Sequence, residues 1–150
     1  MTHTRRSFLK QAGLAGTVAV SGVTAPALVA NLLVALNSAA TAEAINLARQ
    51  SGLDPQIVLD VLSTGAASSR MLEVRGPLMV RGEFPPQMKL DLFMKDLHLI
   101  QDAANTAGAR IPLTDIAERL YAAALAAGHG GDDLACVITE LERSAQGGKP

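Results

Sequence analysis

The stretch from Leu28 to Gln50 constrains the fold of this chain more than any other part of the sequence. It contains no proline or glycine and is rich in alanine and leucine, both of which favour helix. In its first half Leu28, Leu32 and Leu36 form one stripe, and further apolar residues such as Leu33 fill the neighbouring sides. A helix that is apolar nearly all round must be covered on several sides. The stretch therefore predicts one long helix within a bundle of helices.

Glycine, proline and aspartate mark the helix boundaries that follow. Gly52 suits the C-cap of the long helix, and Asp54 with Pro55 suits the start of a second helix that ends near Gly65. Apolar residues at helical spacing support this second helix, namely Ile57, Val58, Val61 and Leu62. Residues 66–88 are less regular. A short helix is expected from Ser69 to Val74, and the breakers after it are Gly76-Pro77, Gly82 and Pro85-Pro86.

Three further helices are expected in the second half of the chain. One spans Lys89 to Ala107, the next begins at Pro112 and closes at Gly128, and Asp132 or Asp133 caps the last. The side chains expected to face the core are Leu92, Phe93, Leu97, Ile100, Ala104, Ile116, Leu120, Ala124, Leu134, Val137, Ile138 and Leu141. No strand-like alternation and no internal repeat occur, and aromatic residues are only 3%. The fold class predicted is all-α, a multi-helix bundle, with a loose tail at residues 146–150.

The start of the chain differs from the rest in charge. Arg5, Arg6 and Lys10 are followed by residues 11–42, which carry no charged side chain. Ten of the 13 Lys and Arg residues and all 14 acidic residues fall in residues 28–150, so that part has a net charge near −4. This order is typical of exported proteins. The whole chain has a formal charge of −1, which gives no support for a nucleic-acid partner.

Residues 4–10, TRRSFLK, resemble the twin-arginine export signal. The following residues 11–24 are too weakly apolar for a lasting membrane span, so membrane contact is expected only in transit. Small residues at Ala25 and Ala27 allow cleavage after Ala27. The predicted organisation is a signal segment at 1–27 and a helical domain at 28–145, with export to the periplasm. The alternative is an ordinary helix with a chance arginine pair in a cytoplasmic protein.

The sequence contains none of the common motifs of a self-contained active site. It has no GxGxxG after a strand, no GxxxxGK[ST] phosphate loop and no GxSxG nucleophile elbow. The three histidines are scattered, so no metal site is expected. His98 and Asp102 stand one helical turn apart, which favours a solvated surface pair over a catalytic one. Cys136 lies among apolar residues and is expected to pack in the core.

Residues 28–143 resemble the C-terminal helical domain of the β-hydroxyacid dehydrogenases, the family of 3-hydroxyisobutyrate dehydrogenase and tartronate semialdehyde reductase. The stretches that carry the likeness are Asn31–Leu33 through Ala42–Ala44, Gly52–Asp54, Phe93–Leu97 with Asp102, Pro112–Leu113, and Gly128–Gly130 leading to Asp133 and Ala135. The resemblance implies a fold like the C-terminal domains of 3-hydroxyisobutyrate and 6-phosphogluconate dehydrogenases. It also implies hydride transfer between a 3-hydroxy acid and NAD or NADP, with an N-terminal Rossmann domain as the other half of the enzyme.

The same resemblance assigns roles to four positions. In the family an acid/base Lys stands near the start of the long helix, within a pattern like G-x-x-G-x-x-x-K-x-x-x-N, and the Asn helps to hold the substrate. Here the Lys position is Ala27 and the Asn position is Asn31. Lys95, within the KD motif, and Phe93 correspond to cofactor-binding positions. The alternative is a purely structural role, in which Lys95 forms an exposed pair with Asp96 and Phe93 packs in the core.

Three functional hypotheses remain open. The first is the helical half of a split oxidoreductase, inactive alone, whose partner is a separate Rossmann-domain chain. This hypothesis expects the chain to lack its own Rossmann domain and its glycine-rich lead-in, as after truncation. The second is an exported, non-enzymatic helical domain, expected as a homodimer that binds or dimerises. The third is a gene remnant.

Overall fold

The computed structural model describes residues 24–147, so the signal-like motif at residues 4–10 and the last three residues lie outside the described part. The described elements are α2 (Ala25–Gln50), α3 (Pro55–Thr64), α4 (Arg70–Arg81), α5 (Leu90–Ala107), α6 (Pro112–Ala126), two 3-10 turns, η2 (His129–Gly131) and η3 (Leu134–Val137), and α7 (Ile138–Gly147). Within these residues there is no strand, only one isolated bridge between Lys89 and Asp133. The prediction of an all-α bundle is confirmed.

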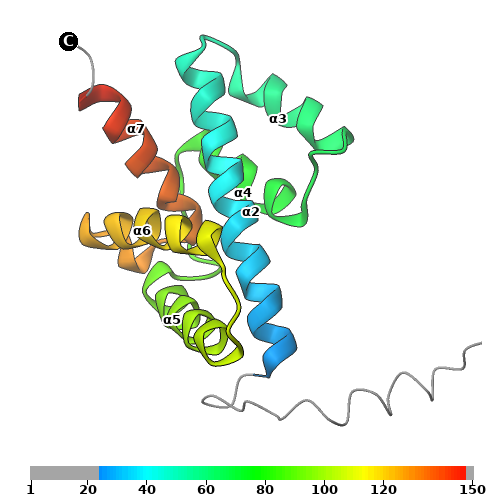
Figure 1. Cartoon of the computed structure of the whole chain (residues 1–150). Helices are drawn as coiled ribbons and strands as arrows, with labels where there is room; N and C mark the ends of the chain where they lie inside the picture. The colour runs from blue at the N-terminus through cyan, green and yellow to red at the C-terminus, as the bar shows by residue number, and fades with distance from the viewer. Residues whose placement is uncertain (1–23, 148–150) are drawn as a thin grey trace, which may run out of the picture.

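Helix α2 is the centre of the bundle (Figure 1), with α5 and α6 on one side and α3 on the other. It contacts each of the other five α-helices in the described part of the chain. Near its end, Arg49 donates hydrogen bonds to the carbonyl oxygens of Met79 (2.8 Å) and Val80 (3.0 Å) in α4, and pairs with Glu142 of α7. By length and composition α2 resembles a membrane span, but its contacts with five helices give it the role of a core helix.

Helix α4 corrects one prediction, because it runs through Gly76-Pro77 instead of ending before this pair. Proline lacks one backbone donor, but the turns on both sides of it are packed against neighbouring helices, and packing outweighs this local cost. Gly76 serves a different purpose. A Cβ there would lie 2.5 Å from Cδ1 of Leu59, so the missing side chain lets α3 approach α4 closely. The helix ends at Gly82, whose φ of 69° favours glycine.

Two predicted core positions are wrong. Leu92 in α5 and Ile116 in α6 are exposed, whereas Phe93, Met94 and Leu97 form the buried side of α5. The buried side of each helix is rotated relative to the predicted stripe. Consequently α6 turns small and polar residues inward and leaves apolar ones outside, a pattern that periodicity alone could not resolve.

The last predicted helix begins as a 3-10 turn. Asp133 caps this turn by accepting a hydrogen bond from the backbone N–H of Ala135 (3.0 Å), and α7 follows from Ile138. Leu134 to Ile138 are all buried, as expected. The loose tail expected from residue 146 overlaps the last turn of α7, which ends at Gly147.

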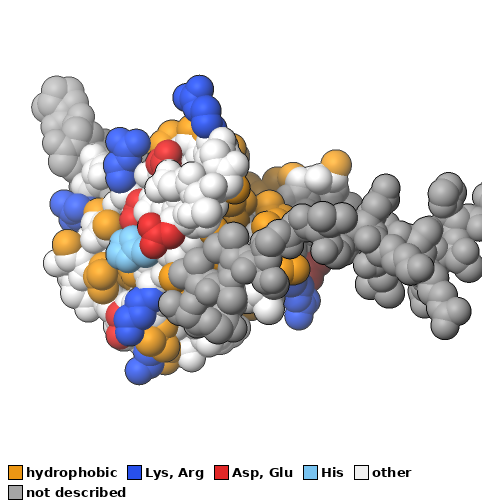
Figure 2. All heavy atoms as spheres, turned by 60° about the horizontal axis from the view of Figure 1, so that its bottom comes forward, with side chains coloured by type: hydrophobic (Ala, Val, Ile, Leu, Met, Phe, Trp, Pro, Cys, Tyr) orange, Lys and Arg blue, Asp and Glu red, His pale blue; other side chains and the backbone are white. Residues whose placement is uncertain are grey.

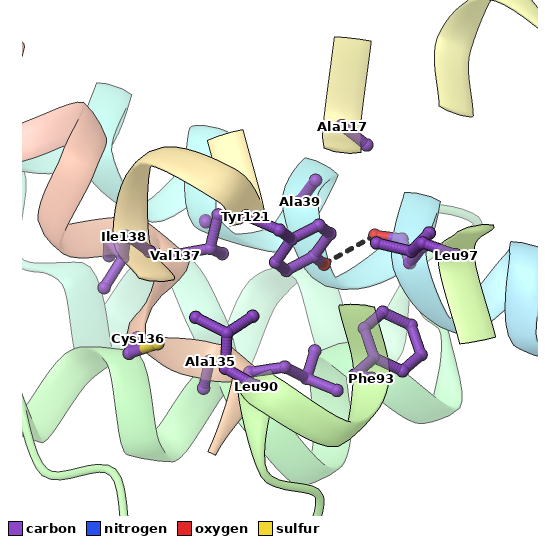
Figure 3. Packing of buried hydrophobic residues seen from close by; sticks show 14 of the residues in the cluster. Ala39, Leu90, Phe93, Leu97, Ala117, Tyr121, Ala135, Cys136, Val137 and Ile138 are labelled. Atoms are coloured by element: carbon purple, nitrogen blue, oxygen red, sulfur yellow. Dashed lines mark hydrogen bonds between the residues drawn. The ribbon is translucent and has the colours of Figure 1, made fainter. Parts of the chain in front are cut away.

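The core contains one aromatic pair (Figure 3). The rings of Phe93 and Tyr121 meet edge to face, with their centroids 5.7 Å apart and an interplanar angle of 75°. The Tyr121 hydroxyl donates a hydrogen bond to the carbonyl oxygen of Ala35 in α2, at 2.9 Å. This pair therefore joins α2, α5 and α6, and the only tyrosine in the chain has a buried, satisfied hydroxyl. Cys136 is buried in the same cluster, as predicted.

A buried ion pair connects the middle of the chain to its end. The Arg75 Nε donates to Asp133 Oδ1 at 3.0 Å, and both side chains are almost fully buried. The other carboxylate oxygen, Oδ2, accepts hydrogen bonds from the backbone N–H groups of Gln87 (3.3 Å) and Met88 (2.9 Å). The Asp133 carboxylate thus holds α4, the loop before α5 and η3 together.

The buried Cys136 thiol and Tyr121 hydroxyl predict a loss of stability at alkaline pH. Burial raises the pKa of the Cys136 thiol from its ordinary 9.0 to about 12, and burial also raises the pKa of the Tyr121 hydroxyl. A group with a raised folded-state pKa contributes stability that is fully present below its unfolded pKa. That stability is lost as the pH rises toward the folded pKa. We expect the free energy of unfolding to fall from about pH 9 by up to about 1.4 kcal/mol per pH unit for each such group.

Urea unfolding measured from pH 8 to 11 checks this. Because the Tyr121 contribution begins only near pH 10, Cys136→Ala should delay the onset of the decline by about one pH unit. An identical pH dependence in the wild type and the variant would contradict the role given to the thiol.

Candidate functional site

Three of the four positions assigned a family role lie where α2 begins and where it passes α5. The Asn31 Nδ2 donates a hydrogen bond to Asp96 Oδ2 at 3.0 Å, and both side chains are partly buried. This contact joins residues 65 apart in the sequence and fixes the start of α2 against the first half of α5. The sequence identifies Asp96 only as part of the KD motif. The structure adds that its carboxylate orients the Asn31 side chain.

Lys95, the neighbour of Asp96, is exposed on α5. Within residues 24–147 no carboxylate lies within ion-pair distance of it, so the predicted alternative of a surface pair with Asp96 does not form there. An exposed cation without a carboxylate partner is able to accept an anionic group from outside this domain. Its cofactor role remains a prediction.

Phe93 lies deeper than its neighbours. Its ring is fully buried and packs on Tyr121, so the structure gives it a place in the core. No face of the ring is open to a ligand in this arrangement. A contact between Phe93 and a cofactor therefore also stays a prediction, and one that would require the surrounding side chains to move.

Ala27 lies in the first turn of α2 and is exposed. It stands about one helical turn before Asn31, so a longer side chain at this position would extend from the same end of the helix. Its methyl group cannot donate or accept a proton. The arrangement therefore offers a positioned amide, Asn31, and a nearby cation, Lys95, but no acid/base group at the expected position.

His98 has a different neighbour from the one the sequence indicates. Its Nε2 lies 3.3 Å from Oε1 of Glu118 in α6, and the Gln101 side chain donates to the same carboxylate. Glu118 was not singled out by the sequence, because α5 and α6 come together only in the folded chain. His98 is largely exposed, so this cluster is a surface contact between two helices. Within the described residues no three His, Cys, Asp or Glu side chains gather as a metal site.

An apolar groove of about 270 Å³ lies beside the start of α2, between this helix and the end of α5. Its lining includes Leu28, Leu32, Ile100, Ala103 and Ile111.

Charged side chains of both signs are mixed on the surface of the domain. On the face shown in Figure 2, basic and acidic side chains alternate with apolar ones, and neither sign gathers in one place. This face therefore has none of the basic patch expected for nucleic-acid binding.

Comparison with known proteins identifies the fold and its lineage. Residues 24–141 match the family model described as NAD-binding of NADP-dependent 3-hydroxyisobutyrate dehydrogenase. L-threonate dehydrogenase from Cupriavidus necator is 36% identical over 111 residues, which cover 74% of this chain and 37% of that protein. The 2-hydroxy-3-oxopropionate reductase of Escherichia coli is 37% identical over 114 residues, covering 76% of this chain and 39% of that one.

A solved structure gives the same result. The 3-hydroxyisobutyrate dehydrogenase from Salmonella typhimurium superposes with a TM-score of 0.72 at 34% identity, covering 75% of this chain and 39% of that chain. The chain thus spans less than two fifths of the length of the curated relatives named above.

Proposed function

Because this chain belongs to the 3-hydroxyisobutyrate dehydrogenase family and carries its helical NAD-binding domain over residues 24–141, we propose that it acts as the helical half of an NAD(P)-dependent 3-hydroxyacid dehydrogenase. The observation that carries the proposal is the Asn31–Asp96 contact, with Lys95 next to Asp96 in the sequence, within the matched region. Substrates named for the relatives, such as L-threonate, indicate the class of hydroxy acid.

The described residues fit only part of a nicotinamide cofactor. Lys95 is free to meet a phosphate or ribose hydroxyl, but the sequence has no glycine-rich loop leading into a helix that would cradle the phosphates. The cofactor, when bound, gives or accepts the hydride. On this proposal Asn31 positions the substrate and Lys95 contacts the cofactor, while a nucleotide-binding domain holds the phosphates. That domain would cover the apolar groove beside the start of α2.

The first experiment mixes the full chain with the separately produced N-terminal nucleotide-binding part of the Cupriavidus L-threonate dehydrogenase. We expect a complex in which NADPH binds more tightly than to the nucleotide-binding part alone. Lys95→Ala should weaken that binding by about tenfold, the effect of losing one charge-assisted contact. The exposed Lys89, the N-cap residue of the same helix, provides the control variant Lys89→Ala. Absence of a complex, or equal affinity in both variants, would reject the proposal.

We further propose that this chain is inactive in hydride transfer on its own, because Ala27 has no titratable group at the family's Lys position. The full chain incubated with NADP and L-threonate should give no NADPH above the rate without protein. Measurable turnover by the purified chain would refute this.

Export is a second proposal, supported by the TRRSFLK motif and the uncharged residues after it. Cleavage after Ala27 would remove residues 1–27, of which the described residues 24–27 are exposed, and would keep the core from Leu28 onward. Mass spectrometry of the native protein from periplasm and cytoplasm tests this. A chain that begins at Leu28 in the periplasm would favour the exported, non-enzymatic function, whereas an uncut cytoplasmic chain would reject export.

A further inference from the structure

The apolar groove beside the start of α2 opens where the described part of the chain begins. Its α2 side includes Ala25, the first residue of the helix, and Val29, which is 63% exposed. The opposite wall comes from the end of α5 and the loop after it, and includes Ala107 and Ile111. Residues that directly precede α2 therefore begin at the edge of this groove.

Every side chain that lines the groove is apolar. The lining consists of alanine, valine, leucine and isoleucine, with no charged or hydrogen-bonding side chain. Such a surface offers no partner to a charged or polar occupant, and contact of its large side chains with water is unfavourable. The groove therefore favours an occupant that is itself apolar and uncharged.

Residues 11–23, QAGLAGTVAVSGV, have this chemistry and directly precede the groove in the sequence. They carry no charged side chain, and they contain Leu14, Val18, Val20 and Val23 among alanines and glycines. They belong to the part of the chain outside the described residues. A short covalent link gives a segment a local concentration of about millimolar at a neighbouring surface, and any free occupant must match it. Attachment to α2 therefore favours this segment over a separate molecule.

The start of α2 also favours an approach of the segment from the groove side. Thr24 is the N-cap residue and has extended backbone angles, with φ −79° and ψ 148°. An apolar residue just before an N-cap often packs against the fourth residue of the helix. Here these two positions are Val23 and Leu28, and Leu28 lines the groove. A contact between them would direct the chain before Thr24 toward the groove.

We propose that residues 11–23 of the uncut chain pack into the groove beside the start of α2, so that the chain covers its own apolar surface. The nucleotide-binding domain of the proposed function would use the same groove, so it must first displace the segment. This competition rests on the proposed function, whereas the packing of the segment does not. The uncut chain should therefore bind that domain more weakly than a variant whose segment cannot pack.

Thiol labelling of the full chain tests whether the groove is covered. Ala107 lines the groove and is exposed among the described residues, so Ala107→Cys places a reactive thiol there. The native Cys136 is fully buried and does not compete for the reagent. Ala122→Cys, at an exposed position of α6 that does not line the groove, is the matched control.

The rate of reaction with iodoacetamide, followed by mass spectrometry, is the measurement. We expect Ala107→Cys to react at least about tenfold more slowly than Ala122→Cys. A segment that is packed for about nine tenths of the time leaves the thiol open only for the remaining tenth.

Aspartates in the segment test whether the segment itself covers the groove. Val18→Asp together with Val20→Asp introduces two carboxylates into residues 11–23 and leaves every described residue unchanged. Because burial of an unpaired carboxylate is unfavourable, labelling of Ala107→Cys should then rise to the rate of the control. Ser7→Asp, outside residues 11–23, should leave the labelling slow. Circular dichroism must show the same helix content in all variants.

Three results would overturn the proposal. Equal labelling of Ala107→Cys and Ala122→Cys, without the aspartates, would show that the groove is open. Slow labelling that persists with both aspartates would show that the segment is not the cover. Labelling that slows as the protein concentration rises would assign the groove to a second copy of the chain. The measurement uses this chain alone, so failure to form a complex with a nucleotide-binding domain leaves it unaffected.

Discussion

Replacement of Asp133 by alanine is expected to lower the free energy of unfolding by about 3–5 kcal/mol. The Arg75 guanidinium would stay buried and charged after losing its carboxylate partner. The backbone N–H groups of Met88 and Ala135 would also lose their acceptor. Burial of these donor groups is unfavourable unless they have an acceptor, and the Asp133 carboxylate is the acceptor that they lose.

Urea unfolding followed by circular dichroism at pH 7 measures this loss. Asp133→Asn retains hydrogen-bond acceptor capacity but removes the charge, so its loss should be smaller than that of Asp133→Ala. The control is Glu73→Ala, which breaks the exposed Arg70–Glu73 pair and should cost less than about 0.5 kcal/mol. A loss below about 1 kcal/mol in Asp133→Ala would show that the buried pair contributes little to holding α4 against η3.

The helix boundaries that the sequence predicted well are those set by local chemistry. Asp54 and Pro55 begin α3, and Pro112 begins α6, because capping and the fixed φ of proline act within one turn. The prediction for α4 was wrong for the opposite reason. Gly76-Pro77 looks like a break locally, but the close approach of Leu59 from another helix explains the glycine, and no local rule contains that contact.

The candidate site shows the same difference between local features, which the sequence predicts, and contacts between distant residues, which it does not. The sequence placed Asn31 and Lys95 on the two helices that meet, since a motif records residue types along the chain. It could not give the hydrogen bond from Asn31 to Asp96, which joins residues 65 positions apart, or the burial of Phe93 behind Tyr121. For the same reason the sequence identified Asp133 as a candidate helix cap and as part of the family likeness, and its pairing with Arg75 became visible only in the folded chain.

The absence of a proton-transfer group leads to the second large effect. In the complex with a nucleotide-binding domain, Ala27→Lys should raise kcat/KM for oxidation of a 3-hydroxy acid by about 10²–10⁴-fold, the usual contribution of general acid–base catalysis. Ala27 is exposed in the first turn of α2, so a lysine there needs no rearrangement of the core. The new amine would stand about one turn before Asn31, the residue proposed to hold the substrate.

The rate of NADPH formation with L-threonate, followed by absorbance from pH 6 to 10, is the measurement. Ala30→Lys is the matched control, because it adds the same charge to another exposed position near the start of α2 but not at the family's Lys position. A general base must be deprotonated, so activity of Ala27→Lys should rise with pH as its amine loses a proton, while Ala30→Lys should show no such rise. Equal activity in the two variants would mean that positive charge alone matters. Complex formation without any gain in Ala27→Lys would mean that the start of α2 no longer reaches the reacting carbon, and that the chain has kept the fold of a dehydrogenase domain without its chemistry.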